Sequence, residues 1–314
     1  MKAFWISLFF SALMARPILI GLRMLKSRQT VSQFAPATHQ VKQGTPTMGG
    51  IIVIVGMIMG LVLTFPFRAG VATAFAGSAL LLILGFAGIG FVDDFVVPRM
   101  IKGKRGLGWR QKIAAQILLA YIGMLPLGLS LPGQLWAIFL ILFGANAYNF
   151  ADGLDGLASG IGLAYCAGLW ALGPGLHPIA LATAGGLVIF LFLNAHPAKI
   201  FMGDVGSLPI GAVFGLAGII MTSAVNGGSG EVWISFTFPT FLALVALNLM
   251  LIAELVPVPM QVLSFKLRKK RIFPATPIHH GFEVRGWPET RVVAAFTLVQ
   301  LLASALAYTI LNGW

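Results

Sequence analysis

Long apolar runs recur along this chain, and they constrain its fold more than any other feature. Most are close to the length of about 20 residues that crosses a bilayer as a helix. They lie near residues 3–22, 47–67, 71–92, 112–131, 134–150, 157–173, 178–195, 206–224, 232–256 and 291–312. With 58% hydrophobic and only 10% charged residues among 314, the chain is too apolar for a soluble domain of this size. We therefore expect one all-α, polytopic membrane domain, residues 1–314, with about ten transmembrane helices.

The positive charges of the chain predict its orientation. The net charge of +12 could suggest a nucleic-acid partner, but the cations cluster between apolar runs, as they do beside anionic lipid headgroups. We expect membrane lipid and no nucleic acid as a partner. Cations follow the first, third, seventh and ninth runs, which places those loops in the cytoplasm and both termini on the periplasmic side. The first run could instead be a cleaved signal peptide, but the cations after it would resist translocation.

Polar groups that can do chemistry gather on the same side of this topology. All five aspartates and four of the five histidines fall in the predicted cytoplasmic loops, near residues 23–46, 93–112, 150–157, 194–206 and 264–291. Charges that were merely solvated would be shared between both faces. The one-sided distribution indicates a single site built from several loops.

Two acidic segments suit a metal or a general base. Asp93 and Asp94 are adjacent at the end of the third run, and two neighbouring carboxylates repel each other unless a cation is near. They suit Mg²⁺, or one of them could act as a general base. Asp204, between Gly203 and the start of another run, is a candidate direct Mg²⁺ ligand.

Amide and aromatic side chains near these carboxylates are candidate substrate ligands. Residues 146–157, which join the fifth and sixth runs, offer donors and acceptors for a sugar, a base or a hydrated metal. They include Asn146, Asn149, Asp152 and Asp155. In residues 194–207, Lys199 could pair with phosphate, and Phe201 could stack on a nucleobase or anchor in the membrane interface.

The last cytoplasmic loop carries adjacent histidines. His279 and His280 precede Glu283, but they lack the spacing of a zinc-binding helix, so hydrogen bonding to phosphate oxygens is the better use. Upstream, Pro257 and Pro259 follow Glu254, which predicts that the ninth helix bends where it leaves the membrane. The bent extension could open a groove for a lipid tail, or Glu254 could be a surface residue at a simple helix exit.

Taken together, these segments resemble the polyprenyl-phosphate N-acetylhexosamine-1-phosphate transferase superfamily, and within it the bacterial phospho-MurNAc-pentapeptide transferases. The shared segments are residues 44–50, the Asp93-Asp94 pair, residues 146–157 and residues 201–207. The sequence of residues 277–289, Pro-Ile-His-His-Gly-Phe-Glu followed by Gly-Trp-Pro-Glu, resembles this branch rather than the GlcNAc-phosphate transferases.

The resemblance implies a reaction and a set of partners. Undecaprenyl phosphate would attack the sugar-linked phosphate of UDP-MurNAc-pentapeptide, giving lipid I and UMP, in an enzyme of the bacterial inner membrane with a cytoplasmic Mg²⁺ site. A homodimer, and inhibition by nucleoside natural products, are also implied. Within the enzyme class, another UDP-HexNAc donor such as UDP-GlcNAc is the alternative.

The resemblance also implies residue roles. Asp204 would bind Mg²⁺, Asp93 would be the base toward the lipid phosphate, and Asp94 would support it. Asn194, Phe201 and Asp152 would hold the uridine and the neighbouring phosphosugar. Lys42, His279 and His280 would contact phosphates or sugar, with His279 counted among the catalytic residues.

Two positions depart from the family pattern. Gly281 stands where a third successive histidine is usual, and Val97 stands where a lysine is usual; both put substrate contacts in doubt more than the metal chemistry. One-step in-line attack is the preferred mechanism, with a covalent intermediate on Asp93 as the alternative. A transporter would need ionisable residues at the middle of several helices, and Glu254 is the main candidate for that. A receptor that binds UDP-sugar without turnover is a third interpretation.

Overall fold

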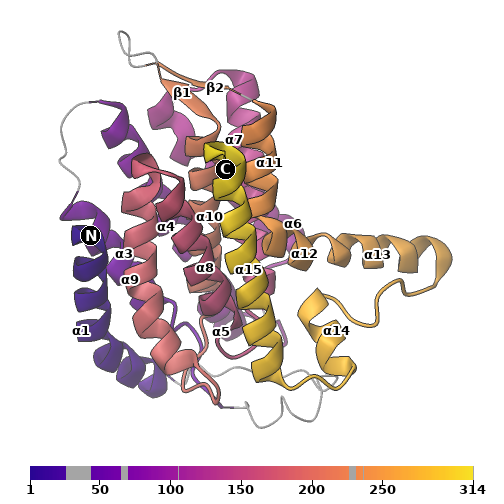
Figure 1. The fold of residues 1–314 in the computed structure, drawn as a ribbon. Helices are drawn as coiled ribbons and strands as arrows, with labels where there is room; N and C mark the ends of the chain where they lie inside the picture. The colour runs from indigo at the N-terminus through magenta and orange to yellow at the C-terminus, as the bar shows by residue number, and fades with distance from the viewer. Residues whose placement is uncertain (26–43, 65–69, 105, 226–230, 236, 314) are drawn as a thin grey trace.

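The chain folds almost entirely into helices (Figure 1). The computed structural model describes residues 1–314 except 26–43, 65–69, 105, 226–230, 236 and 314. The long helices are α1 (Lys2–Met24), α3 (Ile51–Val62), α4 (Val71–Phe91), α6 (Trp109–Met124), α7 (Leu131–Ala151), α8 (Leu157–Leu172), α9 (His177–Asn194), α10 (Asp204–Met221), α11 (Phe238–Leu247), α13 (Pro257–Arg268) and α15 (Glu289–Asn312). The short elements are η1 (Val92–Val96), α5 (Val97–Met100), η2 (Leu125–Leu127), η3 (Pro174–Leu176), α12 (Leu249–Leu255) and α14 (Ile278–Val284).

The expected fold class, an all-α polytopic membrane protein, is confirmed. A helix overlaps each of the ten predicted spans, and seven helical segments of the described chain are long and apolar enough to cross a bilayer. Three further apolar helices, α3, α8 and α11, are shorter. The count of ten crossings therefore stays a prediction.

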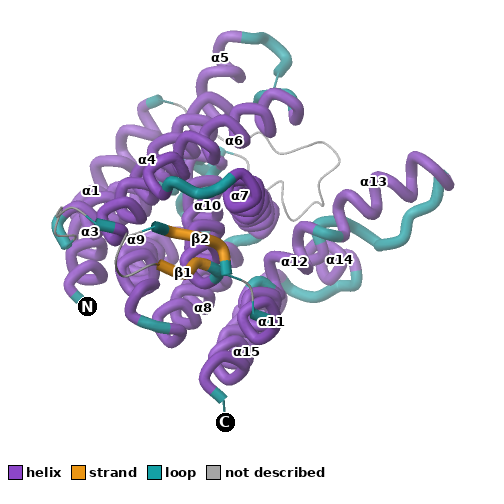
Figure 2. Tube along the Cα trace, turned by 90° about the horizontal axis from the view of Figure 1, so that it is seen from above, coloured by secondary structure: helices purple, strands orange, loops and turns teal. Residues whose placement is uncertain are grey.

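One predicted boundary is wrong. The ninth span was expected to begin at residue 232, but Val232–Ile234 forms strand β2, which pairs antiparallel with β1 (Ser223–Val225). Figure 2 shows this hairpin beside the ends of α7 and α10. The helix begins only at Phe238, after Thr237 accepts a hydrogen bond from the Thr240 amide as its N-cap. Val and Ile favour both strands and buried helices, so a short apolar run does not separate the two.

Helix α10 lies at the centre of the bundle, and 15 of its 18 residues are buried. It packs against α7 and α4 with backbones in contact, because glycines face each other across the α7 crossing and a glycine of α4 faces the backbone of α10 at the other. A Cβ built on Gly144 would lie 2.3 Å from the Gly211 carbonyl oxygen, and one built on Gly90 would lie 2.3 Å from the Asp204 backbone. The second contact brings the end of α4 to the start of α10.

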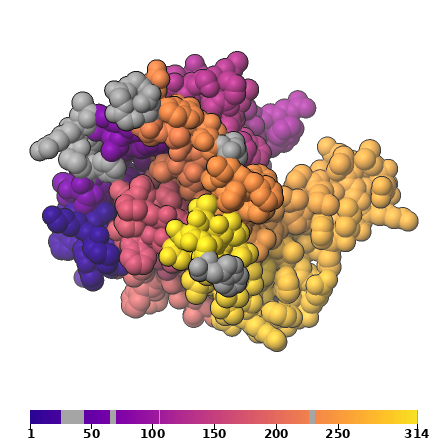
Figure 3. All heavy atoms as spheres, turned by 45° about the horizontal axis from the view of Figure 1, so that its top comes forward, coloured from indigo at the N-terminus to yellow at the C-terminus, as the bar shows by residue number. Residues whose placement is uncertain are grey.

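The polypeptide from α11 to α13 is broken twice. Asn248 separates α11 from α12, and Val256 separates α12 from α13, which starts at Pro257. Helix α13 projects sideways from the bundle in Figure 1, and with α14 it forms the block that stands out in Figure 3. A bend is present, but it lies at Asn248, between α11 and α12, whereas the prediction placed it after Glu254, at Pro257 and Pro259; α12 and α13 run along one line in Figure 1. Glu254, however, is fully buried, so its interpretation as a surface glutamate is wrong.

Candidate functional site

Two carboxylates lie where α4 ends in the single π-helical turn η1, which carries Asp93 and Asp94. Such turns often occur at functional sites. Asp93 Oδ1 accepts a hydrogen bond from the Leu107 amide at 2.6 Å, and Asp94 Oδ2 accepts one from the Val205 amide at 3.2 Å. The two side chains are thus held by different segments, the 101–108 loop and the first turn of α10.

Asp204, the first residue of α10, is the third carboxylate. A helix N-terminus favours negative charge, and the Asn149 side-chain amide, from the end of α7, donates to Asp204 Oδ1 at 2.7 Å and to Ser207 Oγ at 2.8 Å. Asn149 thus fixes the Asp204 side chain relative to α7. One oxygen from each of Asp93, Asp94 and Asp204 lies within 4.8 Å of the others.

Lys112, near the start of α6, provides the positive charge of this cluster. Its ammonium group pairs with Asp204 and lies 3.5 Å from Asp93 Oδ2. Val97, which stands where the family pattern has lysine, is buried in α5. In the sequence, Lys112 is one of several cations that follow the third apolar run. Its position one turn into the helix that follows the acidic pair put it near that pair along the chain, but nothing in the sequence showed which carboxylates it would contact.

The acidic cluster, Asp93, Asp94 and Asp204, fits a divalent cation. Hard cations such as Mg²⁺ bind through one or two carboxylates and complete their shell with water and phosphate oxygens. Asp93, Asp94 and Asp204 would hold such an ion in place of the Lys112 ammonium group. That group would then be able to pair with a phosphate.

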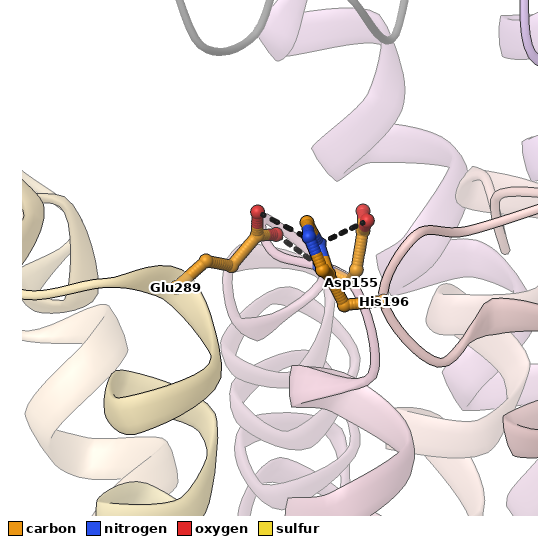
Figure 4. Close-up of side chains that lie close together, drawn as sticks. All are labelled: Asp155, His196 and Glu289. Atoms are coloured by element: carbon orange, nitrogen blue, oxygen red, sulfur yellow. Dashed lines mark hydrogen bonds and ion pairs between the residues drawn. The ribbon is translucent and has the colours of Figure 1, made fainter.

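A second group of ionisable side chains, Asp155, His196 and Glu289, ties three segments together (Figure 4). His196 Nδ1 lies 3.2 Å from Asp155 Oδ2 and 3.6 Å from Glu289 Oε2. The Asp155 amide donates to Glu289 Oε1 at 2.6 Å. These contacts link the α7–α8 turn, the α9–α10 loop and the start of α15, and the group stabilises the arrangement of the loops around the site.

Asp152 lies in the α7–α8 turn and is partly buried. Burial raises the pKa of its carboxyl to about 7, and the negative charge of Asp204 acts in the same direction, while a hydrogen bond from the Gly203 backbone opposes both. A carboxyl with a pKa near neutrality can donate or accept a proton at working pH.

The two histidines of α14 have different environments. His279 is fully buried, and its Nδ1 lies 2.9 Å from Glu254 Oε2. His280 is partly exposed, and its Nδ1 lies 2.7 Å from Glu283 Oε2. A Cβ at Gly281, where the family pattern has a third histidine, would meet only the Ala275 carbonyl oxygen, at 3.6 Å. Space therefore does not explain the glycine.

Three predicted substrate ligands are engaged within the protein. Asn146 donates to Gln116 Oε1 at 2.7 Å, between α7 and α6. Asn194 is buried and joins the Gly156 amide to the Ile200 carbonyl. The Phe201 backbone pairs with Pro46 and Gly49, while its ring is partly exposed. Lys42 lies outside the described residues.

Fold and site together define a class: a helical membrane protein whose polar loops bring three carboxylates and a lysine together. Sequence comparison agrees with that class. Residues 76–222 match the glycosyl transferase family 4 model, and residues 42–54 match signature 1 of the phospho-N-acetylmuramoyl-pentapeptide-transferases.

Curated relatives identify the family more narrowly. The phospho-N-acetylmuramoyl-pentapeptide-transferase of Heliobacterium modesticaldum is 38% identical, covering 97% of this chain and 96% of its own length. That of Moorella thermoacetica is 37% identical, covering 94% of both chains, and that of Deinococcus radiodurans is 34% identical, covering 91% of both. The chain belongs to the phospho-N-acetylmuramoyl-pentapeptide-transferase family. It is a transferase and an integral membrane protein of the bacterial inner membrane.

Proposed function

We propose that this chain transfers phospho-MurNAc-pentapeptide from UDP-MurNAc-pentapeptide to undecaprenyl phosphate, forming lipid I and UMP in peptidoglycan synthesis. The observation that carries this function is the acidic cluster, with Lys112 across it, at the junction of α4, α6, α7 and α10. Two anionic substrates can react only where their charge is neutralised and their phosphates are aligned. A lysine and a cation-binding carboxylate cluster meet that need.

Mg²⁺ is the cofactor of choice for this cluster. A bound divalent cation would neutralise the diphosphate and polarise the phosphorus under attack. We assign Asp204 as its direct ligand, because Asn149 and the N-terminus of α10 hold that carboxylate in place. Asp94, which accepts a hydrogen bond from the Val205 amide, lies beside Asp204 in the acidic cluster.

The reaction is a one-step, in-line displacement. An oxygen of the lipid phosphate attacks the sugar-linked phosphorus of the UDP-sugar, and the bond from that phosphorus to the bridging oxygen breaks, releasing UMP. Asp93 is the base that receives any proton on the lipid phosphate, and Lys112 and His280 pair with phosphate oxygens. Phe201 and Asp152 hold the uridine end, while Asn194, which is buried and bonded to the Gly156 amide and the Ile200 carbonyl, supports the loop that carries Phe201. Lys42 is a further phosphate contact.

The acceptor lipid approaches along the side of the bundle where α13 projects. Val262, Leu263, Phe265 and Leu267 on α13 are exposed, which suits contact with acyl or prenyl chains. A recess of about 490 Å³ lies between α13 and residues 271–276. We place the site on the cytoplasmic face, from the distribution of cations, within one membrane domain. A homodimer and binding of nucleoside inhibitors remain predictions from the family.

Purified protein given UDP-MurNAc-pentapeptide, undecaprenyl phosphate and Mg²⁺ should release UMP and form lipid I. UDP-GlcNAc should give no product; the reverse preference would establish the alternative donor. Binding of either UDP-sugar without UMP release would contradict the enzymatic function. Isotope exchange between UMP and the UDP-sugar without lipid acceptor would replace one-step displacement with a covalent intermediate on Asp93.

A further inference from the structure

Glu254 and His279 form a buried pair, and the proposed reaction gives Glu254 no role. Both side chains are 0% exposed. Glu254 lies on α12, between the two breaks of the α11–α13 segment, and His279 lies on α14. A carboxylate and an imidazole removed from water together are costly unless they interact, and here the Glu254 Oε2 to His279 Nδ1 distance is 2.9 Å.

The hydrogen bond restricts the protonation of the imidazole. If Glu254 is ionised, its carboxylate can only accept, and Nδ1 of His279 is then the donor. Among the described residues, His279 Nε2 and Glu254 Oε1 are both buried with no hydrogen-bond partner. Buried polar atoms without partners are uncommon and concentrate where a protein keeps them for function. The pair thus has one hydrogen bond, between Nδ1 and Oε2, while the other polar atom of each side chain, Nε2 and Oε1, has no partner.

The unsatisfied Nε2 faces the α7–α8 turn. A Cβ built on Gly153 would lie 2.3 Å from it, so the ring is in contact with the glycine that follows Asp152. The His279 ring also lies 4.1 Å, centre to centre, from the ring of His280. His279 therefore contacts both the accessible histidine of α14 and the turn that carries Asp152.

We propose that Glu254 is a positioning residue that orients the His279 ring through its hydrogen bond to Nδ1. The oriented ring, through its Nε2 edge, then fixes the positions of the α7–α8 turn and of His280. This deepens the proposed function, on which its kinetic consequence rests. Glu254 touches neither substrate nor metal; it acts through His279. A hydrogen bond that served only to join α12 to α14 would require neither a defined imidazole tautomer nor a glycine opposite Nε2.

The first test observes the pair without any reaction. Protein labelled with ¹⁵N-histidine should give a His279 Nδ1 resonance typical of a protonated nitrogen hydrogen-bonded to carboxylate, assigned by its loss in His279→Gln. In Glu254→Gln, whose amide can either donate or accept, that resonance should shift or split. An unchanged resonance in Glu254→Gln would overturn the proposal, whatever reaction the protein performs.

The second test is a kinetic double-mutant cycle, measured per folded protein. Glu254→Gln should lower kcat/KM for the UDP-sugar at least tenfold, but less than twofold further in a His279→Gln background. Equal losses in both backgrounds, or no loss in the first, would overturn the proposal.

Tyr165→Phe provides the matched control for both tests. It removes a buried hydrogen bond to Asn248, at the start of the same helix α12, without touching His279. It should leave the histidine spectrum and kcat/KM unchanged. A tenfold loss of kcat/KM in this control would show that any disturbance of α12 slows turnover, and would equally overturn the specific role of Glu254.

Discussion

At the scale of single residues, Lys112 is the group whose role depends most on what occupies the site. Its ammonium group pairs with Asp204 and lies near Asp93, where it occupies space that a divalent cation would need. Lysine and metal therefore compete for the same carboxylates, until a phosphate ligand offers the lysine another partner.

Lys112→Gln should accordingly separate metal binding from turnover. Without substrate, the variant should bind Mn²⁺ more tightly than wild type by about tenfold, the order expected from removing one nearby positive charge, while UMP release should fall by at least 100-fold. Mn²⁺ titration followed by electron paramagnetic resonance measures the first, and the transfer assay the second. Lys104→Gln, which removes an exposed cation of the same loop region, should change neither. Weaker Mn²⁺ binding by Lys112→Gln would contradict the competition.

Gly153 is a second residue whose role depends on a neighbouring side chain, that of His279. Its missing side chain makes room for the His279 ring, which Glu254 holds. Gly153→Ala should lower the melting temperature of the purified protein by several degrees, since the ring must be displaced, and should cost about 1–3 kcal/mol. In a His279→Ala background the same substitution should cost little, because the space is then free. An equal loss in both backgrounds would indicate backbone strain rather than contact with the ring.

At the scale of elements, the α7–α8 turn is where pH should act. The pKa of Asp152 in the folded protein is about 7, above its ordinary value of 3.8, so the folded state holds the proton more tightly than the unfolded state. The contribution of Asp152 to stability is then fully present below about pH 4 and is lost as pH rises through 7.

Asp152→Asn, which mimics the neutral carboxyl, should therefore gain stability relative to wild type as pH rises from 5 to 8. The gain should be at most on the order of 2 kcal/mol for a partly exposed group. Melting temperatures in metal-free buffer at both pH values measure it. Parallel pH profiles of the two proteins would show that Asp152 titrates normally.

The crossing of α7 and α10 is the second element-scale feature, because it carries Asn149 and Asp204 to one place. Gly211→Val would force side-chain atoms into the Gly144 carbonyl, 2.2 Å from the position of the new Cβ, and should cost about 3 kcal/mol or more. Gly88→Ala, on α4 with nothing within 4 Å of its Cβ, should be neutral. Thermal unfolding in detergent compares them, and a tolerated Gly211→Val would refute the close crossing.

The sequence alone predicted the positions of the helices well, but it did not predict which side chains contact one another. The apolar runs predict helices because a segment buried in lipid must be apolar and must satisfy its own backbone hydrogen bonds. The expectation that Asp93, Asp94 and Asp204 lie on the same side follows from counting the predicted crossings. The β1–β2 hairpin, the partner of Glu254 and the pairing of Lys112 could not be predicted. They depend on helix rotation and on contacts between distant segments, which hydrophobic periodicity does not fix.

At the scale of the whole molecule, the site exists only because helices far apart in sequence end at the same level. Asp93 follows α4, Lys112 starts α6, Asn149 ends α7 and Asp204 starts α10, around a core in which α10 is enclosed by its neighbours. In Figure 1 the ends of α1 and α15 that carry the termini point away from α14. The ends of the chain thus lie away from the block that carries His279 and His280.

Stoichiometric metal binding tests this arrangement most directly. Purified wild-type protein should bind one Mn²⁺ that Mg²⁺ displaces, and Asp204→Asn should lose that ion while remaining folded, as judged by an unchanged helical circular dichroism spectrum. Retention of the same Mn²⁺ with unaltered affinity by folded Asp204→Asn would contradict a metal centre at the acidic cluster, and with it the mechanism of transfer.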